Sequence, residues 1–460
     1  MFNCRNAVLM AVAGVLANAG FAMADTNQIA TPVLTLQSEP TQVAAEPTAP
    51  DGLIMQGLAK VGAEKTLNDY GINIYGFVEG GYTYNHRHNT SNVGGIIIPG
   101  PFNHEFGNHF MLNQVDLRFE RLVDGKKWDV GGMVEVMYGS DAARIHSSGM
   151  GFNGSDPTDN NRPNDPKAVA NLDPIWQFDV TQAYIDIGIP VGNGLKIRAG
   201  KFVTLLSYET IDPRNNPFYS HSYLFSMVPF TQTGILGFYT INDQFSVAGG
   251  FTRGWNETLE DGGSCAIDFL GQVNYKINSQ WGLTVNLSVG PQNGADTSHY
   301  RTAIDPIVTF KATDKLSFAA ETLYVYDGGR NGSGSVTHAY GDTWGIALYG
   351  SYIVNDFVTA NVRLEKAHFD TSIGGLNVGE AALGSSSFSA FGRNTVFNTN
   401  FYAITLGTTI TPFPKDPIGK NLSVRPEVRY DYCEDHVFGN GTNDRFKDQL
   451  TFGADVIFKF

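Results

Sequence analysis

The chain has 460 residues, and 31 Lys and Arg against 45 Asp and Glu give it a formal net charge of −14. This acidic balance argues against nucleic acid as a partner, because binding to phosphate backbones needs a basic surface. Hydrophobic residues make up 42% of the chain, yet mean hydropathy is only −0.15, so the apolar side chains are spread out. The 52 Gly, 31 Phe and 20 Tyr favour short strands joined by turns.

The first 24 residues have the pattern of a secretory signal peptide. Arg5 precedes an apolar run over residues 7–17, and the small residues before Asp25 match a signal peptidase site. We therefore predict export, with cleavage near Ala24. Because Cys4 leaves with the signal peptide, the mature chain keeps two cysteines, and the sequence leaves open whether these two pair. They are Cys265 and Cys433.

Residues 25–70 are predicted to hold a linker and one short periplasmic helix. Residues 25–50 are rich in Ala, Thr, Pro and Glu, a composition that is typical of disorder. Apolar residues at helical spacing, Ile54 and Leu58 among them, predict one amphipathic helix over 53–66. No later run approaches the roughly 18 apolar residues of a spanning helix, so any membrane span must be built from strands.

Sixteen segments after residue 71 alternate between apolar and polar residues, as half-buried strands do. The last segment shows the pattern best, since Phe452, Val456 and Phe458 share one face with the terminal Phe460. Most segments have the length that a tilted transmembrane strand needs, about 9–11 residues. The predicted strands are 72–84, 111–122, 128–138, 176–189, 195–206, 234–241, 245–255, 267–277, 281–290, 302–312, 316–327, 343–354, 357–369, 401–411, 422–433 and 450–460.

The connections between these segments alternate in length. Tight turns such as 124–125 and 355–356 carry the Asp, Asn and Gly that hairpins require. Long connections such as 85–110 and 370–400 come between them. Short turns at one rim and long loops at the other are typical of outer-membrane barrels. We predict an all-β fold, a transmembrane antiparallel up-and-down β-barrel of about 16 strands over residues 71–460. A soluble secreted β protein is the alternative class.

Charged residues gather on one face of several predicted strands, where a dry core would make them costly. In 422–433, Arg425 and Arg429 alternate with Val424 and Val428. A water-filled lumen would keep such charges solvated, so we expect this row to face it. The predicted pore-lining residues are Glu79, Arg118, Glu120, Glu135, Lys196, Arg198, Glu321, Arg363, Glu365, Arg425, Glu427 and Arg429.

The connection 207–233 is too apolar and aromatic for an ordinary surface loop. It either folds inward and narrows the pore, or covers the outer mouth or packs on a neighbouring subunit. Its candidates for lining a constriction are Glu209, Asp212, Arg214, Tyr219 and His221.

This stretch resembles the OmpL-like putative beta-barrel porin family. The likeness is carried by Gly200-Lys201-Phe202, Tyr208-Glu209, residues 216–220 and residues 229–234, with residues 75–79 similar to the family's opening strand. The resemblance implies an outer-membrane porin. It implies neither a particular substrate nor catalytic residues.

No enzyme activity, metal or cofactor is predicted. Four histidines of one long connection could bind a metal or respond to pH, but polar loop composition is the favoured explanation, because the connection has neither a cysteine nor a fixed carboxylate spacing. They are His86, His88, His104 and His109. Ser220-His221 lacks the nucleophile-elbow motif of a hydrolase.

The function predicted is an outer-membrane porin of a Gram-negative bacterium, giving passive diffusion of small hydrophilic solutes and ions. The alternative is a barrel that acts as an adhesin or receptor through its long extracellular loops. Expected partners are outer-membrane lipid and lipopolysaccharide, the solutes, the barrel-assembly machinery through Phe460, and further copies of the chain, whose number the sequence leaves open.

Overall fold

The computed structural model describes residues 52–85, 108–147, 176–258, 267–291, 300–327, 341–370, 398–436, 438–439 and 445–460. Two compact units divide the chain, Met1–Val33 and Leu34–Phe460, and every described residue belongs to the second. The predicted signal peptide and linker, like Cys265, lie outside the described residues. Within the described ranges, no helix has the length and apolar character needed to cross a membrane.

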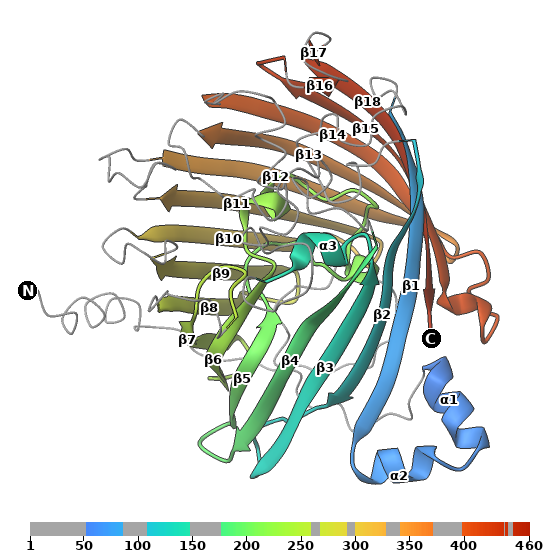
Figure 1. Cartoon of the computed structure of the whole chain (residues 1–460), viewed down its shortest axis with the longest axis vertical. Coiled ribbons are helices and arrows are strands. Elements are labelled where there is room, and N and C mark those ends of the chain that lie inside the picture. Colours follow the sequence, from blue (N-terminus) through green and yellow to red (C-terminus); the bar gives the residue numbers. More distant parts are fainter. Residues whose placement is uncertain are drawn as a thin grey trace, which may run out of the picture. The chain divides into compact units, whose positions relative to one another are not determined.

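Sixteen antiparallel strands close into one barrel, in which β1 pairs with both β2 and β18 (Figure 1). The predicted fold class and strand number are therefore confirmed. A separate small hairpin, β16 (Phe438–Gly439) with β17 (Arg445–Phe446), accounts for the two further strand labels. The barrel strands are β1 (Ile72–Asn85), β2 (Phe110–Arg121), β3 (Asp129–Gly139), β4 (Gln177–Ile189), β5 (Leu195–Val203), β6 (Thr231–Thr240), β7 (Phe245–Thr252), β8 (Asp268–Lys276), β9 (Trp281–Gly290), β10 (Arg301–Lys311), β11 (Leu316–Asp327), β12 (Gly341–Asn355), β13 (Val358–Asp370), β14 (Asn398–Ile410), β15 (Leu422–Cys433) and β18 (Asp448–Lys459).

Most strand limits lie within two residues of the predicted ones, and four differ by three residues, namely the end of β5, the start of β6, the end of β7 and the start of β14. Two of these four flank one connection. The strand predicted over 195–206 ends at Val203, and the one predicted from residue 234 begins at Thr231. Val203 pairs with Thr231 at the last ladder position, and the Thr204 amide donates to the Phe230 carbonyl at 3.0 Å. The chain between them leaves the sheet as residues 204–230.

The single helix predicted over 53–66 is wrong, because two helices form instead. They are α1 (Leu53–Lys60) and α2 (Glu64–Asp69). Gly62 lies between them with φ +78°, a left-handed conformation that ends a helix and that glycine adopts without strain. The Gly62 amide donates to the Ala59 carbonyl at 3.1 Å and so caps α1.

The two faces of the strands are as predicted. On β15, Arg425 and Arg429 are buried inside the ring, whereas Tyr430 between Arg429 and Asp431 is 41% exposed on the outside. On β9, Trp281 is exposed and Asn286 is buried. On these two strands the inward positions carry the polar row and the outward positions the apolar row, as a barrel in lipid requires.

Candidate functional site

Residues 204–230, which we call the inserted segment, lie inside the ring of strands. Of these 27 residues, 22 are buried. The segment contacts Gln114 of β2 and Glu321 of β11, which belong to distant parts of the ring. In Figure 1 it is the green trace between β5 and β6. Of the two placements that the sequence left open, the structure therefore shows the inward one.

Three arginines of the barrel wall donate to backbone carbonyls of the inserted segment. Arg363 of β13 donates to the carbonyls of Ser220 at 2.7 Å and His221 at 3.1 Å. Arg429 of β15 donates to the His221 carbonyl at 2.9 Å. Arg425, also on β15, donates to the carbonyls of Pro213 and Asn216, both at 2.7 Å. An irregular chain inside a barrel needs such partners for its buried carbonyls.

Carboxylates of the wall accept the amide hydrogens of the same segment. The Ser207 amide donates to Asp305 at 2.7 Å, and the Tyr208 amide donates to Glu321 at 3.1 Å. Further along, the Tyr223 amide donates to Glu365 at 2.7 Å and the Ser220 amide to Glu427 at 3.1 Å. The side chains of the wall thus bind the segment mainly through the backbone groups of the segment.

These wall charges also pair with one another and with the segment. Arg363 contacts Glu209 and Glu365, each at 2.7 Å. Arg429 contacts Asp431 at 2.7 Å and Glu365 at 3.1 Å. Arg425 forms ion pairs with Asp455 and with Glu79. Arg363 and Arg429 are 0% exposed. Protein groups therefore surround them in place of the water that the strand pattern predicts.

A second group of predicted residues lies around Asp212. Arg118 of β2 contacts Asp212 at 2.8 Å and Glu135 of β3 at 3.2 Å. Arg214 of the inserted segment contacts the same Asp212 at 2.5 Å. The structure therefore brings Arg118, Glu135, Asp212 and Arg214 together.

The remaining three predicted residues lie apart from these groups. Lys196 and Arg198 of β5 both contact Asp186 of β4, at 3.6 and 2.9 Å. Glu120 accepts a hydrogen bond from the Tyr75 hydroxyl at 2.7 Å. All twelve predicted wall residues point inward, and whether they line a conducting path stays a prediction.

Two carboxylates of the inserted segment are held ionised. Burial alone would raise the pKa of Glu209, but Arg363 and His221 outweigh it and lower this pKa to about 2. Burial alone would likewise raise the pKa of Asp212. The charges of Arg214 and Arg118 outweigh it and hold this pKa well below its usual range. His221 Nδ1 lies 3.2 Å from Glu209 and its ring stacks on Phe225. These contacts fix four of the five predicted constriction residues.

The fifth residue, Tyr219, packs where the wall has no side chain. A Cβ added to Gly81 of β1 would lie 2.4 Å from the Tyr219 ring, and one added to Gly453 of β18 would lie 3.3 Å from it. The Tyr219 hydroxyl donates to Asn113 at 3.1 Å. Gly407 of β14 gives Phe218 similar room. Inward glycines thus allow the close approach of two aromatic rings.

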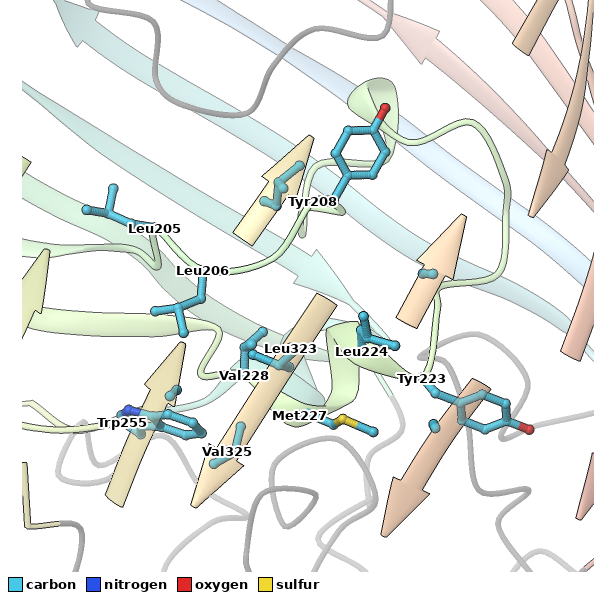
Figure 2. Packing of buried hydrophobic residues seen from close by; sticks show 14 of the residues in the cluster. Leu205, Leu206, Tyr208, Tyr223, Leu224, Met227, Val228, Trp255, Leu323 and Val325 are labelled. Atoms are coloured by element: carbon cyan, nitrogen blue, oxygen red, sulfur yellow. The ribbon is translucent and has the colours of Figure 1, made fainter. Parts of the chain in front are cut away.

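The apolar side of the segment forms a core with the wall (Figure 2). Leu323 and Val325 of β11 lie among Met227, Val228 and Trp255. The short helix η3 (Leu224–Met227) belongs to this core, whereas η2 (Pro213–Asn215) lies where Arg425 binds. The interior is therefore packed with side chains on this side of the barrel.

The chain that follows β3 also packs against the inserted segment. Helix α3 (Ala142–Ile145) follows β3, and Ile145 packs with Ile211 and Phe225 of the segment. Gln114 donates to both Asp141 and the Ile211 carbonyl, each at 2.9 Å.

Several residues that hold the segment were missing from the predicted set. They are Asn113, Gln114, Asp305, Tyr349, Asn361 and Asp431. Alternation along the predicted strands is the signal that could identify five of them, whereas Asn113 follows a register shift in the β1–β2 ladder that the sequence does not reveal. The predicted wall set contains only Glu, Lys and Arg.

The described residues contain no group of three or more His, Cys, Asp or Glu that could hold a metal ion. His86, His88 and His104 lie outside the described ranges. Cys433 is a free, buried thiol.

Several solved protein structures are similar to this chain. The outer membrane channel DcaP of Acinetobacter baumannii is 13% identical, with 85% of this chain and 97% of that chain covered and a TM-score of 0.49. An anion-selective porin from Comamonas acidovorans is 11% identical, with 85% and 99% covered and a TM-score of 0.49. OmpT of Vibrio cholerae is 10% identical, with 85% and 97% covered and a TM-score of 0.47.

Among curated proteins none matches the chain. A family model described as "Putative beta-barrel porin-2, OmpL-like" matches residues 71–460, which include all sixteen barrel strands. The chain therefore belongs to this family of OmpL-like beta-barrel porins.

Proposed function

We propose that this barrel is an outer-membrane porin through which small hydrophilic solutes and ions diffuse passively. The observation that carries the proposal is the closed ring of sixteen strands with a charged inward row and an apolar outward row. Membership of a porin family supports it. The inserted segment narrows the interior, so it sets the size limit of the path.

Weak charge selectivity is expected, because both signs occur in the inward row. The cations include Arg118, Lys196, Arg198, Arg363, Arg425 and Arg429, and the anions include Glu79, Glu120, Glu135, Glu321, Glu365 and Glu427. Many of these charges neutralise each other in ion pairs, such as that of Arg425 with Glu79. We expect a slight preference for cations, to be measured as the reversal potential in a salt gradient.

A second candidate function is supported by how fully the inserted segment is buried. With 22 of its 27 residues buried, the segment could close the path and leave the barrel to act as a receptor or adhesin through its long connections. The two functions differ in one property, conduction by the unmodified protein.

The test is single-channel recording in planar bilayers, with the full chain and with a variant that lacks residues 213–225. The full chain should conduct, and the deletion should enlarge the conductance while heat-modifiable migration shows that the barrel still folds. A Gly-Ser replacement of equal length separates the effect of chain length from that of the docking contacts. If the full chain does not conduct and the deletion variant does, the receptor function is favoured. Equal conductance of the two proteins would show that the segment does not limit the path.

A further inference from the structure

Two carboxylates of the barrel wall lie next to each other where the inserted segment begins. Asp305 belongs to β10 and Glu321 to β11, and both residues are 0% exposed. The ladder between these strands makes the two acids diagonal neighbours on the inward face. The consecutive amides of Ser207 and Tyr208 donate to them, to Asp305 at 2.7 Å and to Glu321 at 3.1 Å. Both carboxyl groups therefore meet the same short stretch of the segment, away from solvent.

Neither acid forms an ion pair with a Lys, Arg or His of the described part of the chain. Elsewhere in the ring, the neighbouring acids Glu79 and Asp455 share Arg425. Asp305 has instead a neutral partner, the Asn286 amide group, which donates to it at 2.9 Å. Two neighbouring buried carboxylates without a counterion are costly. The pair therefore requires a positive charge that these described residues do not supply.

The charged groups nearby do not compensate the pair. Glu209 of the inserted segment acts on Glu321 as a further negative charge. Arg363 contacts Glu209 and Glu365, each at 2.7 Å, so its charge is already shared by two other acids. The surroundings thus add to the demand for a cation.

Three buried oxygen atoms around the pair have no hydrogen-bond partner. They are Asp305 Oδ1, Glu321 Oε2 and the hydroxyl Oγ of Ser207. Ser207 is 2% exposed, and its side chain lies close enough to Glu321 to act on the ionisation of that acid, although its geometry does not meet that of a hydrogen bond. Buried polar atoms normally have a partner. A hydroxyl and two carboxylate oxygens that lack one are the kind of ligands that hard cations prefer.

The charge of these ligands favours a divalent cation over a monovalent one, because two ionised carboxylates are neutralised by one divalent ion. A carboxylate can bind Ca²⁺ through one or both oxygens, and Ca²⁺ accepts irregular sets of about six to eight oxygen ligands. Mg²⁺ requires a regular octahedron and usually retains several waters. A buried site built from three side chains therefore suits Ca²⁺ better than Mg²⁺.

We propose that Asp305, Glu321 and Ser207, which we call the wall cation site, bind one divalent cation of the calcium class. Two of its ligands are acidic and the third is a hydroxyl group. The ion links β10 and β11 to the first residues of the inserted segment and balances the two wall charges. The proposal goes beyond the proposed function and does not depend on conduction by the barrel.

The test measures calcium binding by the folded full chain in detergent, after EDTA has removed bound metal. Equilibrium dialysis followed by elemental mass spectrometry counts the calcium per barrel, and the midpoint of thermal unfolding is measured with and without Ca²⁺. Asp305→Asn and Glu321→Gln keep the shape of each side chain and remove its charge. Asp314→Asn, in the exposed turn between the same two strands, is the matched control.

Ca²⁺ should raise the unfolding midpoint of the parent and of Asp314→Asn equally, because a ligand that binds only the folded state stabilises it. In Asp305→Asn and Glu321→Gln the affinity should fall at least about tenfold, since the charge of the ligands sets calcium affinity. One bound calcium per barrel should be lost in both. Without metal, both variants should be at least as stable as the parent, because each removes a repulsive charge. Ser207→Ala should also weaken binding while both charges remain.

Equal calcium binding by the parent and both acid variants would overturn the proposal. An equal rise of the unfolding midpoint with Na⁺ at matched ionic strength would also overturn it, by showing charge screening in place of a site. A third result against it is that acidification from pH 8 to pH 5 stabilises the metal-free parent but not Asp305→Asn, while neither protein binds calcium. A proton shared by Asp305 and Glu321 would then balance the charge.

Discussion

At the residue scale, Arg425 and Arg429 of β15 are buried inside the ring and donate to backbone carbonyls of the inserted segment. The alternation on β15 correctly places Arg425 and Arg429 inside and Val428 outside. However, Arg425 contacts the carbonyl of Pro213, which lies 212 positions earlier in the chain. No local sequence pattern in either stretch predicts this contact. The expectation of a solvated inner row failed for this reason, since the partners that replace water come from a distant connection.

Replacing Arg429 tests the buried pairs directly. Arg429→Gln removes the cation between Asp431 and Glu365 and one donor to the His221 carbonyl. Breaking a buried ion pair leaves an uncompensated charge, at a cost of about 3–5 kcal/mol. The free energy of unfolding in urea, measured on the refolded barrel in detergent, should fall by that order. The rim variant Lys315→Gln serves as the control, and equal stability of the two variants would contradict the burial described here.

A substitution of Val428 tests the outward face of β15. Val428→Arg puts a charge on the outward row beside Leu406, its partner on β14, which should cost ~2–4 kcal/mol near the midplane of a bilayer. The yield of heat-modifiable, folded protein should drop, whereas Val428→Leu should fold like the parent. Normal folding of Val428→Arg would mean that the outward row does not face lipid.

At the element scale, strand limits follow from alternation except where the chain leaves the sheet. Thr231, Gln232 and Thr233 are polar in succession, so no alternation marks the start of β6. The inward fold of residues 204–230 depends on room inside the ring, which glycines on three other strands supply. Composition identified this connection as unusual, but only the closed ring decides where it goes.

The docking of the inserted segment should depend on pH through Glu209, which lies outside the membrane-spanning strands. Its pKa is lowered to about 2 in the folded protein from an ordinary value near 4.5. A lowered pKa means that the stabilisation is complete above about pH 4.5 and is lost as the pH falls toward 2. The size of the effect is on the order of 3 kcal/mol.

Comparison with Glu209→Gln isolates this group from the other carboxylates that hold the segment. At pH 7 the variant should be less stable to urea, because Arg363 loses one of its anionic partners. The difference between the two proteins should still be present at pH 5 and shrink steadily below pH 4.5. A difference that instead grew on acidification would contradict the assigned direction of the pKa shift.

At the scale of the whole molecule, turn chemistry and loop length predicted the architecture. Paired short and long connections indicated sixteen strands, and the closed ring confirms that number. The ends of the ring close as that pattern requires, since Phe460 and Gly76 exchange two backbone hydrogen bonds of 2.9 and 3.0 Å. The closure removes the free sheet edges, which neither lipid nor water would satisfy well.

The orientation of the barrel in the membrane is the remaining prediction at this scale. Both ends of the ring, Ile72 and Phe460, lie at the rim of the short turns, and a chain that is exported first and inserted afterwards should keep this rim in the periplasm. An epitope tag inserted after Gly332, in the connection between β11 and β12, should be labelled by antibody on intact cells. A tag in the 355–356 turn between β12 and β13 should be labelled only after permeabilisation. The reverse pattern would turn the barrel over and place the long connections in the periplasm.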